Sequence, residues 1–170
     1  MPVLAGVLFF GVDHAARWLA FAIFAAACLT DWLDGYIARA WEQQSDLGRM
    51  LDPIADKLLV GTTVLMLVYA GTISGWSIWA AVIILSREIL VSGLREFLAE
   101  LNVKVHVTRL AKWKTAIQFI ALAMLLVGPA AEQIAPGVTN GGLLILWVAA
   151  LLTLVTGYDY LKASIDHATD

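Results

Sequence analysis

The sequence has little charge and almost no cysteine. Charged residues make up 15% of its 170 residues, whereas a soluble domain usually has about 25%. A soluble fold of this size would therefore have too few polar side chains to cover its surface. The single cysteine, Cys28, excludes a disulfide within the chain. The three histidines are scattered without ligand spacing, and neither a glycine-rich phosphate loop nor a Ser/His/Asp nucleophile arrangement is present.

What the sequence does contain is long apolar runs. Hydrophobic residues make up 61% of the chain, and the mean hydropathy is +0.80. A helix needs about 20 apolar residues to cross a membrane. The sequence predicts spans near residues 15–30, 58–73, 76–94, 113–127 and 142–156, with a glycine- and proline-rich loop at 128–142. Residues 1–11 are apolar but about half as long, and we interpret them as a truncated first helix. The predicted fold is an all-α integral membrane protein with a six-helix transmembrane bundle, forming a single domain over residues 1–170.

The basic residues are distributed unequally between the predicted connections. Of the eleven lysines and arginines, Arg17 alone falls on one side of the membrane, and the other ten lie within 39–57, within 87–114 or at Lys162. Cytoplasmic connections of membrane proteins carry an excess of such residues. The pattern predicts that the 39–57 and 95–112 connections and the C-terminus face the cytoplasm.

Four aspartates lie at the predicted cytoplasmic ends of two neighbouring helices. Asp31 and Asp34 are three residues apart, so they share a helix face, and Asp52 and Asp56 are four residues apart on the next helix. Two antiparallel helices can aim these carboxylates at one point, where they would repel one another without cations. Hard oxygen ligands suit Mg²⁺ or Mn²⁺, and the number of acids is sufficient for two ions. We expect Pro53 in the first turn of the second helix.

Small residues and an arginine accompany the acids. Gly35 and Ala38 share the face of Asp31 and Asp34 and leave room for a ligand, and Arg39 is placed to meet phosphate oxygens. The segment matches the pattern D-x₂-D-G-x₂-A-R-x₈-G-x₃-D-x₃-D at all eight fixed positions, namely Asp31, Asp34, Gly35, Ala38, Arg39, Gly48, Asp52 and Asp56. This pattern resembles the signature of the CDP-alcohol phosphatidyltransferases.

That resemblance implies a set of roles. Asp31, Asp34, Asp52 and Asp56 would bind two divalent ions, and Asp56 would also be the general base that takes a proton from the acceptor alcohol. CDP would be bound by Asp31, Asp34, Gly35, Ala38, Arg39, Gly48 and Asp52. The fold implied is a six-helix membrane bundle, usually a homodimer, in the bacterial inner membrane with its active site facing the cytoplasm. The expected partners are CDP-diacylglycerol and membrane lipids, and no nucleic acid is expected.

A second, basic cluster bears on the acceptor. Arg87 and Arg95 lie about two turns apart on one helix, and Lys112 lies near the start of the next span. Arg87 falls inside an apolar run, where an unpaired charge is costly, so we expect Glu88 or Glu96 to pair with it. Several cations near the cytoplasmic surface favour an anionic acceptor.

The segments SREILVSGLRE, LAKWKT and TGYDYL also resemble those family members whose acceptor is sn-glycerol 3-phosphate. On that resemblance Arg87, Arg95 and Lys112 would bind the acceptor phosphate. Alternatives with the same chemistry are serine, inositol phosphate or phosphatidylglycerol as acceptor. A membrane cation transporter is a further alternative, but its acids should lie at mid-span rather than at one face of the membrane.

Overall fold

A computed structural model describes residues 1–40, 46–100 and 109–168, and these residues form helices and short turns without strands. The helices are α1 (Pro2–Phe10), α2 (His14–Ala40), α3 (Asp46–Tyr69), α4 (Ser77–Glu100), α5 (Arg109–Ala131) and α6 (Val138–Ala168). The all-helical prediction is confirmed for these residues. Three helices contain stretches long and apolar enough to cross a membrane within the described part of the chain: Ser77–Ala99, Trp113–Ala131 and Val138–Tyr158.

Two predicted boundaries are wrong. Helix α3 begins at Asp46, so Pro53 lies inside the helix and not in its first turn. Residues 46–52 continue the helix, and the preference of proline for the first turn is a statistical tendency that neighbouring residues can override. Lys57 donates a hydrogen bond from Nζ to the carbonyl oxygen of Pro53 (3.0 Å) and supports the turn that follows the proline.

The predicted loop at 128–142 is much shorter in the structure. Helix α5 continues through Pro129 to Ala131, and α6 begins at Val138. Gly128 and Gly142 serve helix packing, which a composition-based prediction of a loop does not anticipate, whereas Gly137 lies in the remaining turn with a φ of 89°. A Cβ atom on Gly128 would lie 2.7 Å from Oγ1 of Thr139, and one on Gly142 would lie 3.0 Å from the side chain of Leu125. Small residues of this kind let membrane helices approach closely.

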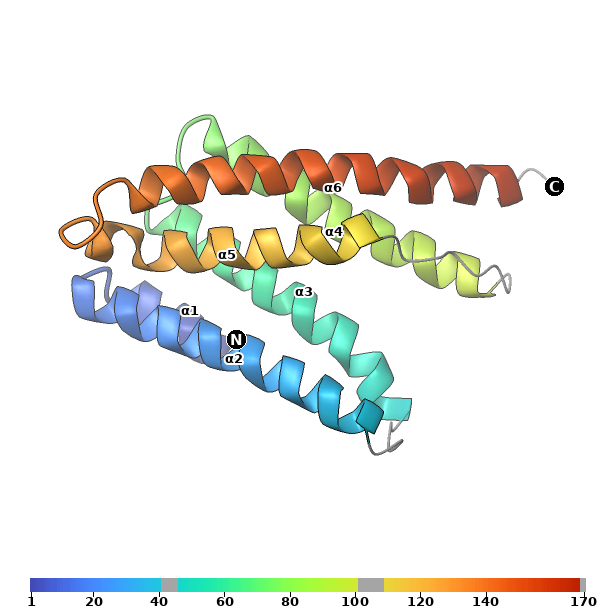
Figure 1. Cartoon of the computed structure of the whole chain (residues 1–170), viewed down its shortest axis with the longest axis horizontal. Helices are drawn as coiled ribbons and strands as arrows, with labels where there is room; N and C mark the ends of the chain where they lie inside the picture. The colour runs from blue at the N-terminus through green and yellow to red at the C-terminus, as the bar shows by residue number, and fades with distance from the viewer. Residues whose placement is uncertain (41–45, 101–108, 169–170) are drawn as a thin grey trace.

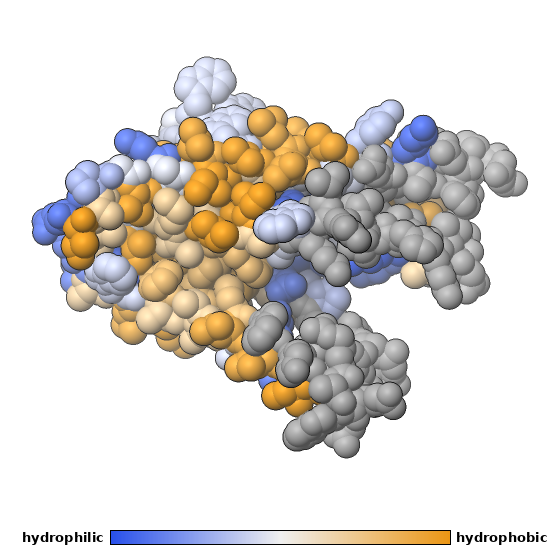
Figure 2. All heavy atoms as spheres, viewed as in Figure 1, coloured by the Kyte–Doolittle hydropathy of each residue, from blue (hydrophilic) through white to orange (hydrophobic). Residues whose placement is uncertain are grey.

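The helices pack around an apolar core that runs through the bundle (Figure 1). Helix α5 contacts α6, α2 and α3, while α4 packs against α6 and α3, and the short α1 packs against α2 and α3. Four fully buried side chains represent the core: Leu67, Ile84, Leu122 and Leu146. Many large apolar side chains remain exposed on the outer faces, as suits a protein surrounded by lipid. Figure 2 shows such hydrophobic residues over the middle of the visible face.

The connections divide between the two ends of the bundle. The α1–α2, α3–α4 and α5–α6 turns lie at one end, and the far ends of α2, α4 and α6 point to the other (Figure 1). At the first end, Arg17 is 5% exposed and donates hydrogen bonds to the carbonyl oxygen of Val12 (3.2 Å) and to Oγ1 of Thr72 (2.9 Å). Arg17 therefore joins the α1–α2 turn to the α3–α4 turn. This arrangement agrees with the predicted grouping of the connections.

Candidate active site

The first candidate cluster lies on α2 and α3, near the connection between them. Asp31 and Asp34 are exposed on the last third of α2, and Asp56 is partly buried on α3. The negative charges of Asp31 and Asp56 both act on the Cys28 thiol of α2. The structure therefore brings one predicted site carboxylate from each helix to the same thiol, across 25 positions of sequence.

The structure describes the remaining residues of the signature only as parts of helices, without their side chains. The structure does not describe the side chains of Asp52, Ala38 and Arg39, or the surroundings of Gly35 and Gly48. Among the side chains that the structure does describe, no group of three or more His, Cys, Asp or Glu residues is placed to hold a metal ion. Convergence of all four aspartates thus stays a prediction.

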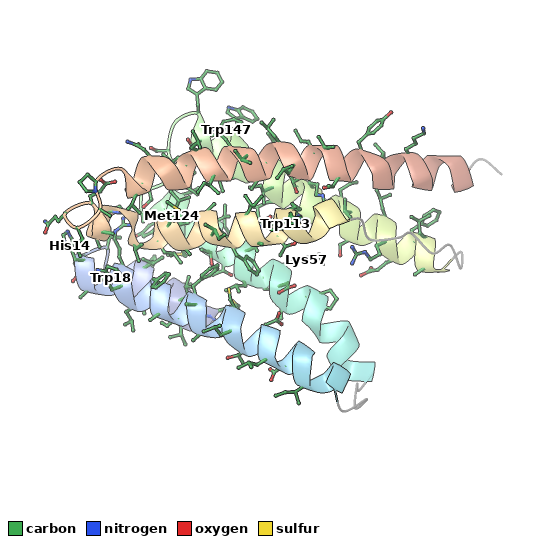
Figure 3. The ribbon with its side chains drawn as sticks, in the orientation of Figure 1. His14, Trp18, Lys57, Trp113, Met124 and Trp147 are labelled. Carbon is green, nitrogen blue, oxygen red and sulfur yellow. The ribbon has the colours of Figure 1, made fainter. Side chains whose placement is uncertain are left out.

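The chemistry of the available donors fits a hard divalent cation. Asp31, Asp34 and Asp56 offer carboxylate oxygens, which Mg²⁺ and Mn²⁺ prefer. Asp31 and Asp56 also have further interactions within the chain. Figure 3 shows Lys57, the neighbour of Asp56, in the half of the bundle away from His14.

The second candidate cluster joins α4 to α6. Arg87 donates from Nε to the carbonyl oxygen of Thr153 (3.1 Å) and from Nη2 to Oγ1 of Thr156 (3.0 Å). Its side chain is only 10% exposed. A Cβ atom on Gly157 would lie 3.1 Å from Cγ of Arg87, so glycine at this position gives the arginine room to lie across α6. The TGYDYL segment thus begins with two residues, Thr156 and Gly157, that accommodate Arg87.

The same cluster extends to α5 through Glu88. One carboxylate oxygen of Glu88, Oε1, accepts a hydrogen bond from Nζ of Lys114 and lies 3.7 Å from Nη1 of Arg87. Of the two predicted partners of Arg87, Glu88 and Glu96, the structure shows Glu88 paired with it. Arg95 is exposed on α4, and its charge acts on the Lys114 ammonium, as does that of Arg87. The side chain of Lys112 lies outside the described residues.

Sequence reasoning assigned Lys112, and not Lys114, to the acceptor phosphate. Lys112 and Lys114 are two residues apart and so point to different sides of α5, and nothing in the spacing indicated which one faces α4. Lys114 is almost completely buried, and Gln118, one turn later on α5, is buried with no partner for its Oε1 atom among the described residues. The sequence did offer one signal: Lys114 and Gln118 are polar residues four positions apart in a mostly apolar helix, so they share one face of it.

The chain is similar to known proteins of one family. Residues 1–155 match the sequence profile of a family described as CDP-alcohol phosphatidyltransferase. The chain is 45% identical to a protein of Rickettsia typhi over 163 residues, covering 96% of this chain and 89% of the relative. It is 41% identical to a protein of Escherichia coli K12, covering 86% of this chain and 80% of the relative. A protein of Cereibacter sphaeroides is 37% identical, with 91% and 85% covered. All three relatives are named CDP-diacylglycerol–glycerol-3-phosphate 3-phosphatidyltransferase.

Proposed function

The chain belongs to the CDP-alcohol phosphatidyltransferase family, and from that premise we propose that it transfers the phosphatidyl group of CDP-diacylglycerol to sn-glycerol 3-phosphate. The products are phosphatidylglycerol phosphate and CMP. The relatives named for this reaction cover most of the chain. Two structural observations support the proposal: the charges of Asp31 on α2 and Asp56 on α3 act on the same Cys28 thiol, and Arg87, Glu88 and Lys114 form a charged cluster between α4 and α5.

Asp31, Asp34, Asp52 and Asp56 are the proposed ligands of two divalent ions, Mg²⁺ or Mn²⁺. When bound, such ions polarise a phosphoryl group and stabilise the charge on a departing phosphate. Gly35, Ala38, Arg39 and Gly48 complete the proposed CDP site together with Asp31, Asp34 and Asp52. Arg39 would bind phosphate oxygens through charge-assisted hydrogen bonds.

Asp56 is the proposed general base. It accepts the proton of the acceptor hydroxyl, whose oxygen attacks the β-phosphorus of CDP-diacylglycerol. A new phosphorus–oxygen bond forms to the acceptor, and the bond from the β-phosphorus to the bridging oxygen breaks, so that CMP leaves with the bonding electrons.

The acceptor phosphate is assigned to Arg87, Arg95 and Lys112. Arginine and lysine beside one another provide the positive charge and the N–H donors that a phosphate monoester requires. The two hydrogen bonds from Arg87 to α6 hold its guanidinium in a defined orientation. A neutral acceptor such as inositol would have no use for this concentration of charge.

The proposed setting is the bacterial cytoplasmic membrane, crossed by six helices, with both clusters facing the cytoplasm and two copies of the chain forming a homodimer. Apolar helices and bacterial relatives support the membrane setting. The distribution of basic residues supports the orientation.

CMP release tests the proposed reaction. Purified protein in detergent or liposomes receives CDP-diacylglycerol, a divalent ion and one acceptor at a time, chosen from glycerol 3-phosphate, serine, inositol phosphate and phosphatidylglycerol. We expect release with glycerol 3-phosphate, loss of release with EDTA, and recovery with excess Mg²⁺ or Mn²⁺. Release with serine but not with glycerol 3-phosphate would refute the acceptor, and no release with any acceptor and ion from folded protein would refute the activity.

A further inference from the structure

Glu88 occupies an unusual place in the basic cluster. Its side chain is 21% exposed, and it lies between cations that come from two different helices. Its Oε1 atom contacts Nζ of Lys114 on α5 and lies 3.7 Å from Nη1 of Arg87 on α4. A carboxylate at this point lowers the positive charge of a site that is proposed to bind an anion, so its presence requires an explanation.

Lys114 supplies the first part of that explanation. Its side chain is 4% exposed, and a buried ammonium group is strongly disfavoured unless an anion pairs with it. Arg87 and Arg95 make the position less favourable still, because their positive charges act on Lys114 as well. Glu88 is the carboxylate that contacts Lys114 in the described part of the chain, and it stabilises the charged lysine beside the two arginines.

The charge balance supplies the second part. Among the described side chains, Arg87, Arg95 and Lys114 carry three positive charges and Glu88 carries one negative charge, which leaves a net charge of +2 before the proposed Lys112 is counted. A phosphate monoester carries a charge of about −1.5 to −2 near neutral pH. The cluster therefore has the charge that the phosphate of the acceptor can neutralise.

We propose that Glu88 is a positioning residue that holds Lys114 in the acceptor site as a further phosphate-binding cation. This inference rests on the proposed function and extends it in two respects. It assigns Lys114 to the acceptor phosphate together with Arg87 and Arg95. It also assigns to Glu88 the role of keeping Lys114 charged and directed toward the arginines while the acceptor is absent.

The Glu88→Gln variant tests this role, with Glu96→Gln as a matched control. Both substitutions remove one negative charge from α4 and keep the side-chain size, but Glu96 is exposed. For Glu88→Gln we expect the KM for glycerol 3-phosphate to rise about tenfold, the result of weakening one charged contact to the acceptor. The KM for CDP-diacylglycerol should change by less than about twofold, because uniform damage to the fold would raise both constants. Glu96→Gln should resemble wild type in both.

A double-mutant cycle with Lys114→Met distinguishes positioning from simple helix pairing. If Glu88 acts through Lys114, the double variant should have the same KM for glycerol 3-phosphate as Lys114→Met alone. The double variant also replaces the buried pair by two neutral side chains, so it remains measurable if Glu88→Gln alone does not fold. A double variant with the wild-type KM, additive effects of the two substitutions, or equal increases in the KM of both substrates would each overturn the proposal.

The same measurements separate this inference from the proposed function. A wild-type chain that uses another anionic acceptor would refute glycerol 3-phosphate as substrate, and the cycle is then measured with that acceptor. A wild-type chain that uses only a neutral acceptor would refute the assignment of Glu88 and Lys114 together with that of the anionic acceptor. A wild-type chain that uses glycerol 3-phosphate while Glu88→Gln leaves its KM unchanged would refute the role of Glu88 alone.

Discussion

Arg87 illustrates how one side chain can belong to the fold and to the proposed site. Its hydrogen bonds to Thr153 and Thr156 fasten α4 to α6, and Glu88 links the same stretch of α4 to α5. An arginine presents several N–H donors in a rigid plane, so contacts with the protein can orient the group for a ligand. Substitution of Arg87 would therefore affect packing and acceptor binding together, which makes it a poor choice for testing either role.

Asp56 offers a cleaner test at the scale of single residues. In Asp56→Asn the side chain keeps its size but no longer accepts a proton and is a weaker metal ligand. We expect the rate of CMP release to fall by about 10²-fold to 10⁴-fold, the usual contribution of a general base. Circular dichroism and gel filtration should remain as in wild type. Asp13→Asn, at the opposite end of the bundle, is the matched control, and turnover near wild type in Asp56→Asn would contradict the assigned role.

Glu132 provides a pH-dependent prediction outside the membrane-spanning segments. Backbone N–H groups of Gly137 (2.8 Å) and Thr139 (3.0 Å) donate hydrogen bonds to its carboxylate, and these bonds, with a further one from the Thr139 hydroxyl, hold the pKa of Glu132 below its ordinary value. Since the folded pKa is lower than the unfolded pKa, the stabilisation is present above the unfolded value and is lost as the pH falls through the folded one.

The measurement compares the Tm of wild type and Glu132→Gln in detergent. We expect wild type to be more stable at about pH 7 and the difference to shrink as the pH falls below about 4. Glu96→Gln should show no such convergence. A Tm difference that is the same at both pH values would show that the Glu132 charge does not stabilise the start of α6.

Among the helix pairs, α5 and α6 make the most extensive contact, and two glycines explain how closely these helices approach each other. Gly128 faces Thr139 and Gly142 faces Leu125 at distances that leave no room for a side chain. The α5–α6 pair in turn contacts α4 and α2. Precise placement of Lys114 on α5 and Thr156 on α6 relative to α4 depends on this packing.

Gly128→Ala tests the packing of α5 against α6. The new methyl group would lie 2.7 Å from Oγ1 and 3.3 Å from Cα of Thr139, and because the latter is a backbone atom, the helices must move apart. We expect a loss of about 1–3 kcal/mol, typical of overpacking, seen as a lower Tm in detergent. Gly6→Ala is the control, since its methyl group would have no neighbour within 4 Å. Equal Tm values for Gly128→Ala and wild type would contradict the close approach.

For the whole molecule, the separation of connections between two ends agrees with the distribution of basic residues. The buried Arg17 lies at the end that carries the α3–α4 turn. Helix α2 ends and α5 begins toward the other end (Figure 1), so Asp31 and Asp34 in the second half of α2 and Lys114 near the start of α5 lie away from Arg17. A water-soluble acceptor and a lipid-linked donor can meet at such an end, because it borders both the membrane and the aqueous phase.

Cysteine labelling tests the orientation of the molecule. In a Cys28→Ala background, Ser74→Cys places a thiol in the α3–α4 turn, and Lys162→Cys places one near the end of α6, both at exposed positions. A membrane-impermeant maleimide applied to the outer face of spheroplasts should label Ser74→Cys, while Lys162→Cys should react only after the membrane is opened. The reverse result would place the candidate active site on the outer face.

The fold class and the placement of the paired acids on two neighbouring helices were predictable from the sequence. Long apolar runs indicate membrane helices directly, because the hydropathy of a segment depends on its composition alone. Residues three or four positions apart share one face of a helix, so the spacing of Asp31 with Asp34 and of Asp52 with Asp56 places each pair on one face. The ends of the helices were less predictable. Pro53 and Gly128 lie inside helices because contacts with other parts of the chain outweigh their local preferences.

The sequence by itself determined that this is an apolar helical protein with paired acids on two helices and cations on later ones. The tertiary structure decided which of these residues meet. Lys114 pairs with Glu88 across 26 positions, and Arg87 reaches Thr156 across 69. Local periodicity specifies the face of one helix but not the rotation of that helix against its neighbours. That rotation depends on the packing of all the helices together, and it selected Lys114 to face the arginines in the basic cluster.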